Sequence, residues 1–108
     1  MTRLADIVPD FVAELEGALS GSGRAALASK LRNAEVERCT FDREQGAGYI
    51  YLRGATPPAA ETFSFREPHW FGVEVDHDGR LHGIDLFSRD EVFARLKERL
   101  APGTFIDV

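Results

Sequence analysis

The sequence predicts an α+β fold: an N-terminal helical hairpin, an antiparallel β-meander of about four strands, and a C-terminal helix. Apolar residues recur at helical spacing before residue 34 and again between residues 92 and 100. Between these segments lie short runs of β-branched and aromatic residues separated by turn residues. With 108 residues the chain has the length of one domain. We therefore expect a single domain composed of residues 1–34, 35–87 and 88–108.

The composition argues against several classes of protein. Apolar residues make up 44% of the chain and charged residues 29%, as is usual for a globular domain and unusual for a disordered one. The net charge is −5, and no basic run supplies the phosphate contacts of a nucleic-acid binder. No stretch has the apolar length of a signal peptide or the roughly 20 residues of a membrane helix. We expect a cytoplasmic protein that by itself binds neither nucleic acid nor a membrane.

The first 34 residues predict two helices that pack as a hairpin. The first begins at Pro9, whose missing N–H costs nothing in a first helical turn. A connector at residues 20–23, rich in glycine and serine, interrupts the apolar periodicity, which then resumes. The residues that form the apolar faces are Phe11, Val12, Leu15, Ala18 and Leu19, followed by Ala26, Leu27, Leu31 and Ala34.

Strands are predicted at residues 36–41, 48–52 and 62–65, with a turn at 42–46. In the second strand both faces are apolar, because Ile50 and Leu52 point one way and Tyr49 and Tyr51 the other. A solvated sheet face would alternate with polar residues. We expect this strand to be covered on both sides, by helices on one and by more helix or another subunit on the other.

Residues 71–86 predict a hairpin whose register follows from its apolar pattern. A loop at residues 77–79 with a bulge at Gly83 places the apolar side chains on one face, in the pairs Val75–Leu81, Val73–Ile84 and Phe71–Leu86. The opposite face then pairs two acids with two bases, Glu74 with His82 and Asp76 with Arg80. The alternative, a two-residue turn at Asp78-Gly79, would leave Leu81 on the polar side.

The histidines of this hairpin do not predict a metal site. His77 lies in the loop and His82 on a strand, whereas zinc sites need three or four convergent ligands, and the chain has no CxxC or HExxH motif. The acids around His77 lack the twelve-residue frame of a calcium loop. Cys39 has no motif partner and is expected to be a core residue. We therefore predict no metal, no cofactor and no catalytic residue.

The C-terminal segment predicts a capped helix and a docked tail. Residues 88–91, Ser-Arg-Asp-Glu, have the pattern of a capping box, with serine at the cap and glutamate three residues later. The apolar stripe that follows consists of Val92, Phe93, Leu96 and Leu100, and Pro102-Gly103 ends the helix. Residues 104–108 are apolar enough to dock, as a sheet edge or against a neighbouring chain.

Residues 40–87 resemble the DUF2283 family of small prokaryotic domains of unknown function. The matching segments are Phe41-Asp42, Tyr49–Leu52, Val73–Asp76, Asp78–Arg80 and Gly83–Leu86, whereas Gln45-Gly46 and Pro68-His69-Trp70 depart from the family pattern. The resemblance implies a compact antiparallel β-meander with an attached helix and no established catalytic residues. Relatives are often encoded beside small candidate toxins, so it also implies an antitoxin-like or partner-binding role.

Two functions remain open on the sequence. The first is a non-catalytic protein-interaction domain, which forms a homodimer or masks a partner protein through an aromatic surface. Its candidate residues are Tyr49, Tyr51, Phe63, Phe65, His69 and Trp70, and the alternative for each is a place in the core. The second is a small-molecule site or enzyme with a pocket beside the Pro57-Pro58 loop, where Tyr51, Glu67, His69 and Trp70 would converge.

Overall fold

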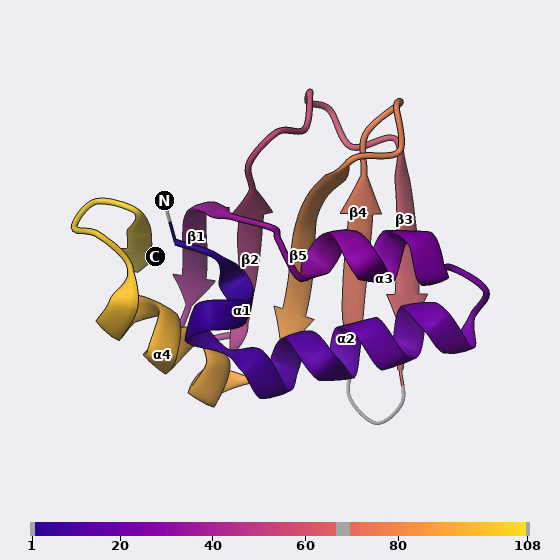
Figure 1. Ribbon diagram of the computed structural model, residues 1–108. Helices are drawn as coiled ribbons and strands as arrows, with labels where there is room; N and C mark the ends of the chain where they lie inside the picture. Colours follow the sequence, from indigo (N-terminus) through magenta and orange to yellow (C-terminus); the bar gives the residue numbers. More distant parts are fainter. Residues whose placement is uncertain (1, 67–69, 108) are drawn as a thin grey trace.

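In the computed structural model, which describes residues 2–66 and 70–107, one sheet is covered by helices on a single face (Figure 1). The helices are α1 (Leu4–Ile7), α2 (Pro9–Gly21), α3 (Ala25–Leu31) and α4 (Asp90–Arg99). The strands are β1 (Val36–Asp42), β2 (Ala47–Leu52), β3 (Glu61–Phe65), β4 (Phe71–Val75), β5 (Leu81–Phe87) and β6 (Phe105–Asp107). Their order in the sheet is β3-β4-β5-β2-β1-β6.

The α+β class is confirmed in general, but the antiparallel meander of about four strands is wrong in strand number and order. After β2 the chain crosses to the far edge, where β3 pairs with β4, and β5 returns to lie beside β2. This places β2, the strand with two apolar faces, inside the sheet between β1 and β5. The sixth strand, β6, pairs with β1 in parallel, so the sheet is mixed. The parallel pairing reflects the α4 crossover, since a tight turn can join only antiparallel neighbours.

The predicted helical hairpin is present as α2 and α3. Its inner face buries Phe11, Val12, Leu15, Leu19 and Leu31. The short helix α1 precedes it and was not predicted, because four residues are too few for a periodic pattern. The amide of Leu4, at the start of α1, donates to Ala34 O at 2.9 Å.

The three apolar pairs predicted for the β4–β5 hairpin are confirmed, but the predicted pairing of Glu74 with His82 is wrong, because the bulge lies one residue before Gly83. Val75 pairs with Leu81 and Glu74 with Gly83, so His82 is the extra residue of the bulge. The prediction for Asp76 was wrong in one respect. Asp76 stands opposite Arg80 as expected, but its carboxylate is buried, with 2% of the residue exposed, and accepts backbone N–H groups instead of facing solvent.

The predicted capping box at Ser88 is wrong. Helix α4 begins one residue later than expected, with Arg89 at the cap position and no side-chain cap bond. Ser88 has a φ of 56° and donates its amide to Gly46 O at 2.9 Å. Arg89 fixes the start of α4, because its guanidinium forms ion pairs with Glu14 of α2 at 2.8 Å and with Glu91 at 2.6 Å. A tertiary ion pair thus replaces the local cap.

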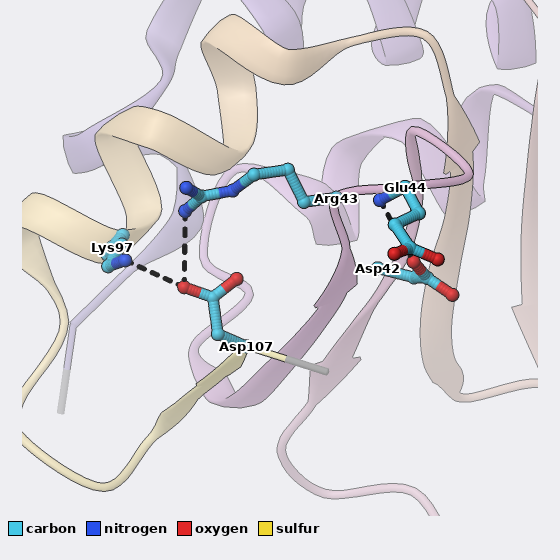
Figure 2. Close-up of polar contacts among 5 residues, drawn as sticks. All are labelled: Asp42, Arg43, Glu44, Lys97 and Asp107. Carbon is cyan, nitrogen blue, oxygen red and sulfur yellow. Dashed lines mark hydrogen bonds and ion pairs between the residues drawn. The ribbon is translucent and has the colours of Figure 1, made fainter.

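The C-terminal tail docks as a sheet edge, one of the two outcomes predicted for it. The amide of Cys39 donates to Thr104 O at 2.8 Å, and Phe105 packs against the core. Asp107 anchors the end of β6, because its Oδ2 accepts from Lys97 Nζ of α4 at 2.7 Å and from Arg43 Nη2 at 3.3 Å (Figure 2). The same view shows Asp42, which accepts the Glu44 amide at 3.1 Å and closes the β1–β2 turn.

The core lies between the helices and the sheet and contains Cys39, as predicted. Its largest fully buried side chains include Phe71, Phe93, Leu4, Leu15, Ile50 and Ile84. The rings of Phe93 and Phe41 stack at 4.5 Å between centroids. Gly48 lies beneath them, where an added Cβ would come within 2.6 Å of the Phe93 ring. Close packing of α4 on β2 therefore requires glycine at residue 48.

Candidate interaction surface

The sheet face opposite the helices carries no helix or strand from the described part of the chain (Figure 1). Side chains alternate along each strand, so the neighbours of the helix-facing Ile50 and Ile84 point to this other side. We call it the open face and define it by Thr40, Tyr49, Tyr51, Glu74, His82, Asp85, Phe87 and Ile106. Half-covered antiparallel sheets of this kind are common, but their uncovered faces are usually polar.

The two tyrosines of β2 shield each other on the open face. Their ring centroids lie 4.5 Å apart, and the guanidinium of Arg38 lies 4.1 Å above the Tyr51 ring. The Tyr49 ring occupies the space above Gly83, where any Cβ would collide with it. Both tyrosines are half-buried without the second layer that the sequence led us to expect. Within the described chain, side-chain neighbours provide that cover, because a tyrosine ring can bury its body and keep its hydroxyl polar.

A hydrogen-bonded cluster joins three strands at the centre of the open face. The Tyr49 hydroxyl of β2 donates to Glu74 Oε1 of β4 and lies 2.9 Å from His82 Nδ1 of β5. Thr62 Oγ1 of β3 donates to Glu74 Oε2 at 3.0 Å. With the hydroxyl proton directed to Glu74, the matching imidazole tautomer carries its proton on Nδ1 and donates it to Tyr49. The cluster thus ties the sheet together through side chains.

Burial raises the pKa of two groups on the open face, Tyr49 and Asp85, and of one group in the core, Cys39. It raises the pKa of the Tyr49 hydroxyl far above its ordinary value of 10, and the hydrogen bond and negative charge of Glu74 add to the effect. It also raises the pKa of Asp85, together with the charge of Glu74. In the core, burial raises the pKa of the Cys39 thiol to about 12. At neutral pH Tyr49 is therefore a hydrogen-bond donor and Cys39 an unreactive thiol.

Five of the six residues predicted for an aromatic surface lie in the described part of the chain, and these five are divided between the two faces of the sheet. Phe63 and Phe65 of β3 pair with Val73 and Phe71, which places them on the helix-covered side. The Phe65 ring stacks on Phe71 at 5.1 Å, and the Arg24 guanidinium lies 4.1 Å above the Phe63 ring. Trp70 packs its ring against Phe87 at 4.8 Å, at the edge of the open face. Tyr49, Tyr51 and Trp70 thus remain candidates for one surface.

The pocket predicted around Tyr51 and Trp70 is not assembled by these two residues. Tyr51 pairs with Gly83, whereas Trp70 contacts Phe87, four residues further along β5. At the rise of a β-strand this separation is roughly 13 Å. The other two residues of the predicted pocket, Glu67 and His69, lie outside the described residues.

The sequence predicted Glu74 and His82 on one polar face, where the structure has them, but it paired them directly and missed Tyr49, whose hydroxyl contacts both. The missing information was the neighbour of β5, since only the pairing of β2 with β5 brings Tyr49 over Gly83. It also missed Phe87 and Ile106, which are 42% and 41% exposed on the open face. The sequence could have predicted the position of Phe87. Side chains alternate along a strand, so Phe87 points to the same side as Asp85 and away from the side of Leu86.

The described residues, 2–66 and 70–107, contain no group of three or more His, Cys, Asp or Glu side chains arranged to hold a metal ion. No helix in this part of the chain combines the length and the apolar character needed to cross a bilayer. Comparisons of the chain with known protein families, with curated proteins and with solved structures find no match. The resemblance to DUF2283 therefore stays a prediction.

Proposed function

We propose that this chain is a non-catalytic protein-interaction domain of the cytoplasm, and that it self-associates by burying its open face against a second copy. The observation that carries the proposal is the one-sided cover of a six-stranded sheet. Phe87 and Ile106, the large apolar side chains most exposed among the described residues, both lie on the uncovered side. A face that joins exposed apolar groups to half-buried aromatic rings is typical of a protein interface.

The charges of the open face suit a pairing of two identical surfaces. Glu74 and Asp85 lie on β4 and β5, whereas Arg38 lies on β1 at the other side of β2. A twofold axis running along β2, between two stacked sheets, would set Arg38 of each copy over the acidic strands of the other. In an isologous dimer each copy makes the same contacts to the other in this way. The complementary charges would favour this alignment of the two copies.

The chemistry of the open face supports association in preference to catalysis. A general base needs a pKa near the working pH, and the Tyr49 hydroxyl is shifted far above it. The Glu74 carboxylate already accepts from Tyr49 and Thr62. These bonds hold the side chains in fixed positions, so the surface is preorganised for docking at a small cost in side-chain entropy.

Light scattering coupled to size-exclusion chromatography, run over a range of protein concentrations, tests the proposal. We expect a concentration-dependent dimer that is lost in Phe87→Glu and in Ile106→Glu, because each places an unpaired charge in the interface. The matched control is Ala13→Glu, an exposed residue on helix α2, which should dimerise like the parent chain. A monomer at all concentrations up to about 1 mM, the Kd of a very weak complex, would contradict self-association.

Binding of a different protein through the same face is the alternative, and it is the antitoxin-like role that the DUF2283 resemblance implies. The two are distinguished by the same variants. If the parent chain is monomeric and a partner is found, Phe87→Glu and Ile106→Glu should abolish that complex while Ala13→Glu leaves it intact. The small-molecule alternative at Tyr51 and Trp70 is not favoured, because their strand positions keep them apart.

A further inference from the structure

A hollow of about 470 Å³ opens between helix α3 and the adjoining ends of β2 and β5. It lies on the helix-bearing side of the sheet and is therefore separate from the open face. Its apolar wall is formed by Ala34, Leu52 and Leu81. Leu52 and Leu81 belong to the core, with 3% and 7% of each residue exposed, so the wall is part of the rigid interior. The volume falls in the range of small-molecule sites, roughly 300–1,000 Å³.

Three cations that are far apart in the sequence line this hollow: Lys30 of α3, Arg53 just after β2 and Arg80 just before β5. Within residues 2–66 and 70–107 their side chains make no hydrogen bond or ion pair, and Arg80 interacts only electrostatically, with the charge of Asp76. One acid, Glu35, shares the lining. The site is thus positive on a chain whose net charge is −5.

Backbone hydrogen bonds hold two of these cations in place. The amide of Arg53 donates to Glu35 O at 2.9 Å. The amide of Arg80 donates to Asp76 Oδ1 at 2.9 Å, and that carboxylate is itself buried. The main chain at both arginines is therefore fixed, and a ligand would have to order only the side chains. Preorganisation of this kind lowers the entropic cost of binding.

We propose that this hollow binds a small organic anion whose carboxylate or phosphate head is held by Lys30, Arg53 and Arg80 and whose apolar body packs on Leu52 and Leu81. The head-group class follows from the excess of guanidinium donors, which match carboxylate and phosphate oxygens in bidentate geometry. The apolar body follows from the wall, where Ala34, Leu52 and Leu81 border the hollow and apolar contact with a ligand is favourable. This site goes beyond the proposed association and does not depend on it.

Amide chemical shifts, followed by NMR during titration of the full chain, test the proposal with defined probes. 1-Naphthyl phosphate and 1-naphthoate carry the two head groups on the same ring, and 1-naphthol carries no ionised head at neutral pH. We expect saturable shifts at residues 29–35, 52–54 and 80–81 with one or both anions, and binding of 1-naphthol weaker by about tenfold or more. Whichever anion binds more tightly identifies the head group.

The variant that tests the assignment is the double substitution Arg53→Gln and Arg80→Gln, which should weaken binding of the preferred anion by about tenfold or more. Arg99→Gln, an exposed arginine at the end of α4, is the matched control and should change the Kd less than about twofold. The dispersion of each spectrum shows whether the variant is folded. Absence of saturation with both anions at about 5 mM, an unchanged Kd in the folded double variant, or equal binding of 1-naphthol would overturn the proposal.

Discussion

Asp76 shows how one side chain can organise a hairpin and a distant loop together. Its Oδ1 accepts the amides of Asp78 and Arg80, both at 2.9 Å, and its Oδ2 accepts the amide of Thr56 at 2.9 Å. The bond from Thr56 is the largest cause that lowers the pKa of this carboxyl, followed by those from Arg80 and Asp78. The ionised carboxylate is therefore the form that the folded protein stabilises.

This gives a pH-dependent prediction with a defined sign. Since the pKa of Asp76 is lower in the folded than in the unfolded chain, its contribution to stability is complete above the ordinary value of 3.8 and is lost as the pH falls through the folded value. We expect Asp76→Asn to lower the melting temperature by several degrees at pH 7 and to flatten its fall below pH 4. Thermal unfolding by circular dichroism from pH 7 to pH 2 measures both effects. Asp78→Asn, at the exposed loop, is the control and should keep the parent's pH profile.

Gly83 and Tyr49 should be energetically coupled, because the ring occupies the space of a side chain at residue 83. We expect Gly83→Ala to cost about 1–3 kcal/mol by displacing the ring, and to cost much less in a Tyr49→Ala background. Urea denaturation of the parent, the two single variants and the double variant measures this cycle. Additive effects would show that the ring can move aside without cost.

At the scale of elements, the start of α4 depends on Arg89 and not on Ser88. We expect Arg89→Ala to lower the free energy of unfolding by about 1.5–3 kcal/mol, because it leaves the partly buried Glu14 without its charged donor. Ser88→Ala should cost less than about 0.5 kcal/mol, whereas loss of a genuine cap costs about 1 kcal/mol. Ser88→Gly should be neutral or stabilising, since φ at this residue is 56°. Urea denaturation compares the three variants. If Ser88→Ala lowered the free energy of unfolding more than Arg89→Ala, the result would contradict this prediction and support a cap at Ser88.

The two edges of the sheet are protected by different elements. β6 covers β1 with only three residues, and Asp107 anchors it to Lys97 and Arg43. The hydrogen bond from Lys97 is the main reason that the pKa of the Asp107 carboxyl lies below its ordinary value. At the opposite edge β3 carries the exposed polar residues Glu61, Thr62 and Ser64, and polar or charged residues on an edge strand discourage pairing with other chains.

For the whole molecule, Cys39 is a reporter of cooperative opening. The thiol lies on β1, the strand next to the edge strand β6, is fully buried, and has a pKa raised by burial to about 12. We expect its labelling by a thiol reagent at pH 8 to be at least about a thousandfold slower in the native protein than in urea, because access requires global unfolding. Rates followed by absorbance across a urea series measure this. A ratio near ten would mean that β6 detaches on its own.

At this scale the one-sided cover of the sheet also determines what self-association would achieve. The helices of the described residues bury one face, and a second copy on the other face would convert two layers into four. The sequence hinted at this need through the two tyrosines of β2, but an aromatic face can be satisfied in part by its own neighbours. Arg38 over Tyr51 and Tyr49 over Gly83 do so here.

What the sequence alone determined was local. Periodicity identified the α2–α3 hairpin and the strands, and apolar parity established the three apolar pairs of the β4–β5 register, with the bulge misplaced by one residue. What only the tertiary structure decided was which strands become neighbours, because β2 and β5 are joined by no turn and their pairing leaves no mark on either segment. That pairing built the Tyr49–Glu74–His82 cluster and split the predicted aromatic set between two faces. Short-range sequence patterns determine local structure. A surface is formed by segments far apart in the sequence that meet only when the core is formed.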